Sequence, residues 1–298
     1  MDFLESLKIS TNLRICRNEP MKNHTGYGVG GPAKYYVSVN SFNDLRTVVD
    51  FAKEFSLPLK IIGNGTNVLF SDKGFDGVIV SVKGLTGLFM KGERVFCACG
   101  VYLKKLVNFS VEQGYTGLEA LSGVPATLGG AVVMNAGAFG HNISDYIVKV
   151  DVLKDGKLCT LNKDECGFRY RGSRLLDRKE IVLSAEFSLP VCDCKFECLE
   201  RVREYSIKRK FNQPTGKTCG SVFKNPDGFS AGYLIEHSGL KGFSLGGASV
   251  SHKHCNFIVS SDDATANDVA SLIKIIKEKV YKKYGIVLEE EIEYIGEF

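Results

Sequence analysis

The sequence lacks tryptophan, and none of its 298 positions falls in a long uncharged apolar run. The missing tryptophan excludes no class of function. A membrane-spanning helix needs about 18 or more consecutive apolar residues, so the sequence predicts no membrane partner. The first 20 residues place acidic side chains where a secretory signal peptide has a basic start and an apolar core. We therefore expect a cytoplasmic protein.

The sequence also lacks a basic run or arm. Lys and Arg number 38 against 34 Asp and Glu, a net charge of +4. Nucleic-acid-binding domains concentrate basic residues on one face or along one segment, so we expect no nucleic-acid partner. The small positive excess is compatible with a local basic pocket for a phosphorylated ligand. Hydrophobic and charged contents of 44% and 24% are typical of globular proteins.

The ten cysteines show neither a disulfide framework nor a metal-site spacing. In a cytoplasmic protein cysteines are normally reduced, so we expect free thiols. Cys192, Cys194 and Cys198 form a C-x-C-x3-C cluster. This spacing matches neither the paired C-x2-C of zinc sites nor a ferredoxin run. We expect incidental thiols at a strand-to-helix junction and no metal.

Hydrophobic periodicity and turn signals predict a mixture of helices and strands. Ser41 opens a helix in a capping-box-like sequence, and Asp155-Gly156 predicts the turn of a hairpin. The other main expectations are a strand at 59–62, a charged helix from Asp193 to about Lys210, a helix from Asp263 or Thr265 to Gly285, and a last strand at 286–295. The sequence therefore predicts an α+β fold.

Three glycine-rich segments stand out at 23–33, 63–67 and 122–140. Glycine lets the backbone approach a ligand closely, and consecutive N–H groups in tight turns bind anions. One such loop is often only a turn, but three in one chain favour a dinucleotide-shaped ligand. No G-x-x-x-x-G-K-[ST] motif is present, and the glycines at 28–30 lack the rest of the Rossmann fingerprint.

Three polar groups lie far apart in the sequence. Two arginines stand beside a hydroxyl at 168–173, a serine lies in a glycine-flanked turn at 218–226, and four acids occupy 288–293. Ser221 lacks the G-x-S-x-G elbow, and His254 has no H-E-x-x-H context. Each group also has an ordinary interpretation as a surface arginine, a turn serine or an exposed acidic strand. On the residues alone both interpretations stay open.

Taken in order along the chain, these segments resemble the UDP-N-acetylenolpyruvoylglucosamine reductase family of flavoenzymes. The resemblance runs from about Asn23 to Gly296. It implies a two-subdomain FAD-binding fold of the vanillyl-alcohol-oxidase type plus a smaller α+β substrate-binding domain. The implied domains are 1–82 with 294–298, then 83–210, then 211–293. The short connection between Asp177 and Leu189 resembles the shorter form of the family.

The resemblance also implies a reaction. NADPH delivers hydride to non-covalently bound FAD, NADP leaves, and N5 of the reduced flavin passes hydride to UDP-N-acetylglucosamine enolpyruvate, giving UDP-N-acetylmuramate. Negative charge then develops on the α-carbon and its carboxylate. The implied catalytic residues are Arg171 and Glu291, which stabilise this charge, and Ser221, which protonates the α-carbon. The residues alone do not favour Ser221 over Cys219 for this role. We expect a monomer.

The binding residues are carried over from the same resemblance. Those assigned to FAD are Gly63, Asn64, Gly65, Thr66, Asn67, Ser122, Gly123, Pro125, Thr127, Gly129, Gly130, Ala131, Asn135, Ala136 and Gly137. Those assigned to the sugar nucleotide are Tyr170, Asn225 and His254, with Lys210 or Lys217 for its diphosphate. Ala126-Thr127 stands where Gly-Ser is common in the family, and Ser260 stands where Asn is usual.

Two alternative functions are compatible with part of this sequence. An FAD-linked oxidase of the wider superfamily often tethers its flavin through His or Cys and does not require Arg171, Ser221 and Glu291. A nucleotide-sugar or flavin-binding protein without turnover has no use for the catalytic segments.

Overall fold

A computed structural model describes residues 3–11, 13–178 and 180–298. The chain forms two compact units, each built from three segments. Unit 1 comprises Met1–Cys16, Tyr36–Asn64 and Gly77–Arg209, and unit 2 comprises Arg17–Tyr35, Gly65–Asp76 and Lys210–Phe298. Both contain helices and strands, which confirms the α+β class. The division into three domains stays a prediction.

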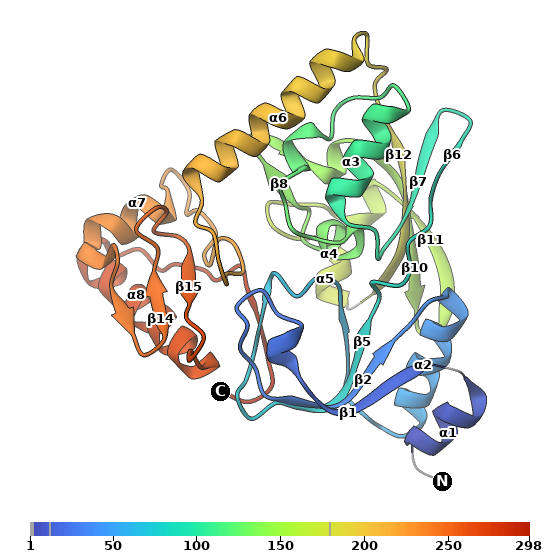
Figure 1. Cartoon of the computed structure of the whole chain (residues 1–298), viewed down its shortest axis with the longest axis horizontal. Helices are drawn as coiled ribbons and strands as arrows, with labels where there is room; N and C mark the ends of the chain where they lie inside the picture. The colour runs from blue at the N-terminus through green and yellow to red at the C-terminus, as the bar shows by residue number, and fades with distance from the viewer. Residues whose placement is uncertain (1–2, 12, 179) are drawn as a thin grey trace. The chain divides into compact units, whose positions relative to one another are not determined.

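A five-stranded antiparallel sheet is the centre of unit 1 (Figure 1). Its strands, in spatial order, are β11 (Lys157–Asn162), β10 (Ile147–Lys154), β12 (Ile181–Ser188), β7 (Arg94–Ala98) and β6 (Leu88–Lys91). The predicted turn joins β10 to β11, with φ of 50° at Asp155 and 75° at Gly156. In the middle strands Val150 pairs with Ala185, which in turn pairs with Cys97, and all three are buried.

Short helices cover one side of this sheet. Helix α4 (Leu128–Val133) packs against β12 and β7, and Figure 1 shows α3 (Leu103–Glu112) on the same side. Leu103, Leu106 and Val107 form the buried face of α3, as their spacing predicts. Shorter elements of unit 1 are α5 (Arg174–Arg178), β8 (Gly137–Ala138), β9 (His141–Asn142), η2 (Glu119–Leu121), η3 (Ile143–Asp145) and η4 (Asp164–Cys166).

A second sheet has the order β1-β2-β5-β3. Its strands are β1 (Arg14–Pro20), β2 (Pro32–Ser38), β5 (Phe75–Ser81) and β3 (Leu59–Ile62). Helix α2 (Phe42–Glu54) begins with the predicted capping box, in which the Ser41 side chain accepts from the Asp44 N–H. Helix α1 (Phe3–Ser10) packs against α2.

Unit 2 is built around one long helix. Helix α8 (Ala266–Tyr284) packs against β13 (Ser244–Leu245) and β14 (Ala248–Val250), and β15 (Ile258–Ser260) pairs with β14. Thr265 caps α8 and Gly285 ends it at φ 69°, as predicted. Its apolar face is buried: Val269, Leu272, Ile273, Ile276 and Val280. Each such side chain contributes roughly 1.5–3 kcal/mol when fully removed from water.

The rest of unit 2 is short elements and loops. They are η1 (Met21–Asn23), β4 (Val68–Phe70), α7 (Ala231–Ile235), η5 (Glu236–Leu240) and β16 (Glu293–Ile295). The predicted strand at 286–295 is wrong for most of its length, because only β16 is a strand and it pairs in parallel with β4. Residues 289–291 bond instead to the segment 222–224, which removes them from that ladder.

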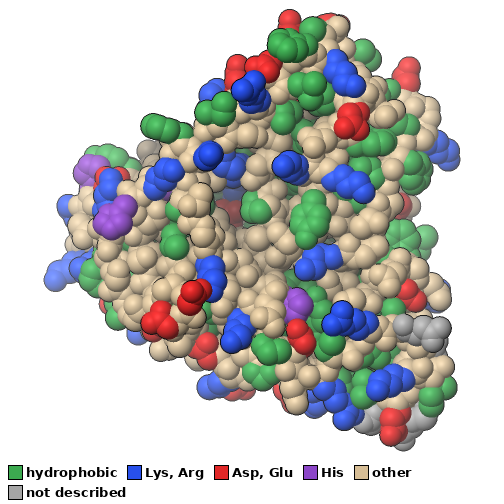
Figure 2. Space-filling view, viewed as in Figure 1, with side chains coloured by type: hydrophobic (Ala, Val, Ile, Leu, Met, Phe, Trp, Pro, Cys, Tyr) green, Lys and Arg blue, Asp and Glu red, His purple; other side chains and the backbone are tan. Residues whose placement is uncertain are grey.

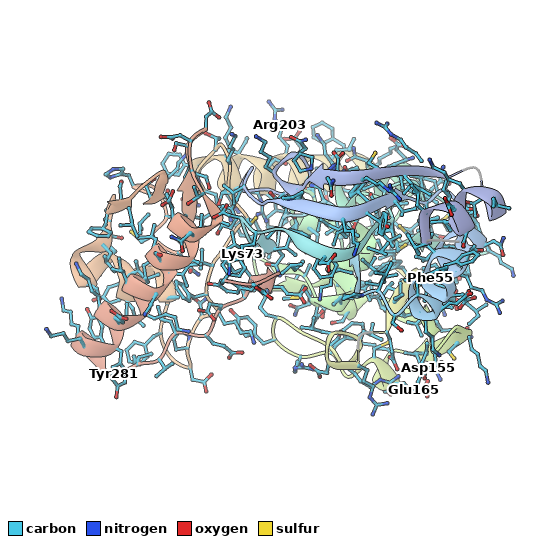
Figure 3. All side chains as sticks on the ribbon, turned by 90° about the horizontal axis from the view of Figure 1, so that it is seen from below. Phe55, Lys73, Asp155, Glu165, Arg203 and Tyr281 are labelled. Atoms are coloured by element: carbon cyan, nitrogen blue, oxygen red, sulfur yellow. A yellow bond between two sulfur atoms is a disulfide. The ribbon has the colours of Figure 1, made fainter. Side chains whose placement is uncertain are left out.

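Helix α6 (Lys195–Asn212) is the charged helix predicted from Asp193. It begins at Lys195, just after the predicted start, and the Cys198 N–H donates to the Cys194 carbonyl. Figure 3 shows the Arg203 side chain on this helix, and that of Tyr281 on α8. Acidic and basic side chains are interspersed over the face shown in Figure 2, in keeping with the small net charge. In the described part of the chain no helix combines the length and apolarity of a membrane span.

The expectation that all ten cysteines are free thiols is wrong. Cys192 and Cys198 form a disulfide, and the other eight cysteines are free. The physical reason is the tight entry into α6: Cys192 follows β12 and bonds through its N–H to the Gly114 carbonyl, while Cys198 lies in the first turn of the helix. This reversal brings the two Cα atoms to 6.9 Å. The spacing alone carried no such signal.

We expect the double variant Cys192→Ser/Cys198→Ser to lose about 2 kcal/mol of unfolding free energy, because the disulfide closes a short loop in the unfolded chain. Urea unfolding without reductant measures this, and Cys194→Ser is the matched control, since Cys194 is an exposed free thiol. Thiol titration of the denatured, unreduced protein should find eight groups, and ten would contradict the disulfide.

Candidate active site

The loops of unit 1 that the sequence assigned to a cofactor lie against each other. The side chain of Asn64 donates from Nδ2 to the Pro125 carbonyl at 2.8 Å, and its Oδ1 accepts from the Tyr102 hydroxyl at 3.2 Å. Thr127 pairs with Tyr102 in an isolated β-bridge just before α4. Residues 63–64 and 122–130, which we call the glycine-rich loop cluster, are therefore brought together from separate parts of the sequence.

Two hydroxyls in this cluster are buried without a partner among the described residues: Ser122 Oγ and Thr127 Oγ1. Leaving a buried hydroxyl unpaired costs about 1–3 kcal/mol. Gly63 makes the close approach possible, because a Cβ there would lie 2.1 Å from Thr127 Oγ1. At Gly130, by contrast, a Cβ would meet nothing within 4 Å. The cluster thus combines unpaired hydroxyls with an open glycine face, an arrangement suited to phosphate oxygens.

The arginine segment docks beside the second half of the predicted cofactor loop. Arg171 Nη2 donates to the Gly137 carbonyl at 3.1 Å, and the Arg171 guanidinium lies 5.1 Å from the centre of the Tyr170 ring. Asn135 donates from Nδ2 to the Arg169 carbonyl at 3.0 Å. Arg171 has a φ of 52°, an uncommon value for a residue other than glycine. Such strain is frequent at functional positions.

Arg209 is a basic residue of this region that the sequence interpretation missed. A Cβ added at Gly123 would lie 2.5 Å from Arg209 Nε, so the two residues are in close contact. The guanidinium also lies 5.8 Å from the Phe139 ring centre, and burial lowers its pKa. A guanidinium stays charged even so. It was overlooked because α6 carries many charges and nothing in their spacing distinguishes this one.

In unit 2 the structure brings Ser221 and Glu291 onto neighbouring backbone segments. The Glu291 N–H donates to the Val222 carbonyl at 2.7 Å, and Phe223 forms an isolated bridge with Glu290. On its other side the serine segment bonds to 256–257: Ser221 bridges Phe257. The segment 221–224, which we call the serine strand, therefore lies between two others.

The structure separates Ser221 from Cys219, which the sequence left as alternatives. Cys219 is buried, its Sγ donates to the carbonyls of Gly65 and Val68, and burial raises its pKa to about 12. The thiol is thus held inside the core of unit 2. Ser221 is half-buried and lies on the serine strand. Its hydroxyl is the more accessible of the two groups.

The loop 63–67, predicted as one cofactor loop, is divided between the two units after Asn64. The Gly26 N–H donates to the Gly65 carbonyl at 2.8 Å. Asn67 accepts at its own carbonyl from the Glu293 N–H, and its Nδ2 donates to the Glu291 carbonyl at 3.1 Å. The Asn67 side chain therefore holds the segment that carries Glu291, a contact the sequence did not predict.

The predicted substrate residues of unit 2 have different surroundings. His254 Nδ1 accepts from the Asn256 N–H at 3.3 Å, and burial lowers the His254 pKa, so the ring is neutral near pH 7. Asn225 accepts from the Ala231 N–H at 3.0 Å. Lys217 forms a 2.6 Å ion pair with Asp262. Lys210 is exposed, and its carbonyl accepts from Lys253.

Comparison with known proteins decides the family. The C-terminal domain of UDP-N-acetylenolpyruvoylglucosamine reductase matches residues 212–295, and an FAD-binding domain matches 33–162. A reductase of that name from Caldanaerobacter subterraneus is 40% identical over 95% of this chain and 94% of its own length. One from Carboxydothermus hydrogenoformans is 41% identical with the same coverage. The chain belongs to the UDP-N-acetylenolpyruvoylglucosamine reductase family. It is an oxidoreductase with an FAD-binding domain.

Solved structures agree with this. The UDP-N-acetylenolpyruvylglucosamine reductase of Thermus caldophilus has a TM-score of 0.82 and 35% identity, and the alignment covers 95% of this chain and all of that one. A Physcomitrella patens BBE-like 1 protein reaches a TM-score of 0.58 at 13% identity, which shows a shared fold alone. The FAD-binding fold expected for the reductase family is therefore confirmed.

Two glycine variants test the glycine-rich loop cluster. Gly63→Ala should destabilise the protein by about 1–3 kcal/mol, because its Cβ overlaps Thr127 Oγ1. Gly130→Ala has open space and should leave the unfolding free energy unchanged or slightly higher. It should nevertheless weaken FAD binding, because the methyl group fills the open face. Thermal melting and flavin retention after gel filtration measure the two effects. Full flavin affinity in Gly130→Ala would contradict the prediction that FAD binds at the glycine-rich loop cluster.

Proposed function

We propose that the chain reduces UDP-N-acetylglucosamine enolpyruvate to UDP-N-acetylmuramate in the cytoplasm, as a monomer, with non-covalent FAD as cofactor and NADPH as electron donor. The observation that carries the proposal is the 2.7 Å bond from the Glu291 N–H to the Val222 carbonyl. It places the predicted proton donor and the predicted glutamate on adjacent segments, in a chain of the reductase family.

The residues of unit 1 fit a flavin dinucleotide. The unpaired hydroxyls of Ser122 and Thr127 are donors for phosphate oxygens, and Gly130 leaves space for the ligand. Arg209 adds a positive charge beside Gly123. Bound FAD would carry two electrons from NADPH to the enol carbon of the substrate.

Arg171 is the residue we assign to the charge that develops on the substrate carboxylate. Its guanidinium is permanently charged, and the Gly137 carbonyl and the Tyr170 ring orient it. A preorganised cation of this kind stabilises developing negative charge without reorganising during the reaction. Glu291 is assigned to the same enolate, either as a protonated donor or as a positioning group.

Ser221 is assigned the proton transfer to the α-carbon. A serine hydroxyl is a weak acid, so its contribution depends on placement and on the basicity of the carbanion that it meets. The position of the hydroxyl on the serine strand, held on both sides by backbone bonds, supports this role. The burial of Cys219 argues against the thiol as the donor.

An anaerobic absorption experiment tests the reaction. The purified protein should show a flavin spectrum that NADPH bleaches and UDP-N-acetylglucosamine enolpyruvate restores. Flavin that stays with the chain after denaturation, or bleaching that only oxygen reverses, would favour an oxidase instead. A colourless protein that FAD cannot reconstitute would overturn the proposal.

Ser221→Ala tests the proton donor. We expect reduction by NADPH to keep its rate, since no carbon is protonated in that step, while reoxidation by the enolpyruvyl sugar slows by about 10²–10⁴-fold. Stopped-flow absorbance separates the two rates. Cys219→Ala is the matched control, and its folded fraction should retain fast reoxidation. Equal reoxidation rates in Ser221→Ala and the wild type would remove Ser221 from the mechanism.

A further inference from the structure

For the reaction proposed above, on which this inference rests, we propose that Asn256 is a positioning residue. Its carboxamide fixes the serine strand so that the Ser221 hydroxyl keeps one orientation toward the α-carbon. Asn256 does not touch the reacting atoms in this role and acts through the backbone of Phe223. Nothing in the sequence motif around it indicated such a function.

The Asn256 side chain makes the two hydrogen bonds to the serine strand that the backbone of a neighbouring strand would otherwise make. Its Nδ2 donates to the Phe223 carbonyl at 2.8 Å, and its Oδ1 accepts from the Phe223 N–H at 3.0 Å. The main-chain carbonyl of Asn256 also accepts from the Val222 N–H at 2.8 Å. One residue therefore satisfies three polar groups of the serine strand. Both Asn256 and Phe223 are buried, with exposed fractions of 4% and 1%, so water does not replace these bonds.

The serine strand follows a glycine, whose backbone is restrained less than that of other residues. Gly220 has a φ of 79°, and a Cβ there would meet nothing within 4 Å. Glycine adopts positive and negative φ about equally readily, so Gly220 by itself does not fix the direction of the strand that follows. The opposite edge of the strand is held by the Glu291 and Lys224 backbone bonds, to Val222 and Glu289 respectively. Asn256 completes the other edge and so fixes the strand from both sides.

Asn256 is itself rigidly held. Its N–H donates to His254 Nδ1, and the Phe257 N–H donates to the His254 carbonyl at 2.9 Å. The Phe257 ring lies 4.8 Å from the His254 ring, edge to face. The Ser251 N–H in turn donates to the Phe257 carbonyl. This turn, 251–257, gives the carboxamide a fixed frame from which to hold Phe223.

A purely structural asparagine would satisfy buried groups without affecting one chemical step more than another. A positioning residue instead affects the step in which Ser221 takes part. The two roles are distinguished by comparing the half-reactions in the FAD-loaded protein. Asn256→Ala should slow reoxidation by the enolpyruvyl sugar by about 10²-fold, the scale expected for a misplaced reacting group. Reduction by NADPH should be unchanged.

Asn256→Asp supplies a second, sharper readout. The aspartate keeps an acceptor for the Phe223 N–H, but when ionised it presents a second acceptor to the Phe223 carbonyl. Once protonated, the carboxyl group donates as the amide did. Its burial raises the pKa of an aspartate, so reoxidation in this variant should recover as the pH falls through that pKa. Wild type and Asn256→Ala should show no such recovery.

Thr265→Ala is the matched control for stability. Thr265 caps α8 in the same unit and lies outside the proposed machinery. We expect it to lower the melting temperature, as we also expect of Asn256→Ala, while leaving reoxidation fast. If Asn256→Ala slows both half-reactions equally, or if Asn256→Asp shows no recovery at low pH, the positioning role is overturned. If Ser221→Ala itself leaves reoxidation unchanged, the proposed proton donor fails instead.

Discussion

The 2.7 Å hydrogen bond between the Glu291 N–H and the Val222 carbonyl is the contact on which the candidate site depends. It joins segments far apart in the sequence, and it explains why residues 289–291 do not continue β16 as a regular strand. Asn67 holds the outer segment and Asn256 the inner one through their side-chain amides. Backbone pairing and two carboxamides thus hold the segments that carry Ser221 and Glu291, while the proposed catalytic side chains take no part in these bonds.

Burial distinguishes residues that are equal candidates on the sequence alone. Cys219 and Ser221 are two positions apart, yet the thiol points into the core and its pKa rises to about 12. The hydroxyl stays half-buried on the serine strand. In unit 1 the same principle leaves Ser122 and Thr127 buried and unpaired beside an open glycine. Unpaired buried hydroxyls are costly, and their presence in the glycine-rich loop cluster supports the FAD site that we propose there.

Local sequence signals predict structure where a few neighbouring residues decide it. The capping box at Ser41, the turn at Asp155-Gly156 and the end of α8 at Gly285 all formed as predicted, and of the two predicted starts of α8 the structure has Thr265. The strand predicted at 286–295 failed because alternation of side chains does not say which partner a backbone will find. The prediction of free thiols at Cys192 and Cys198 is wrong because their pairing follows from the chain reversal into α6, which their spacing does not indicate.

The sequence by itself determined the class of fold and the glycine loops, because each depends on residue type and order within short segments. The catalytic candidates came from its resemblance to the reductase family. Only the tertiary structure decided which candidates meet. It assigned Asn67 and Asn256 to holding the Glu291 and Ser221 segments, and it placed Arg209 against Gly123. The physical reason is that these contacts link residues distant in the chain, and no local propensity or periodicity encodes the pairing of distant backbone groups.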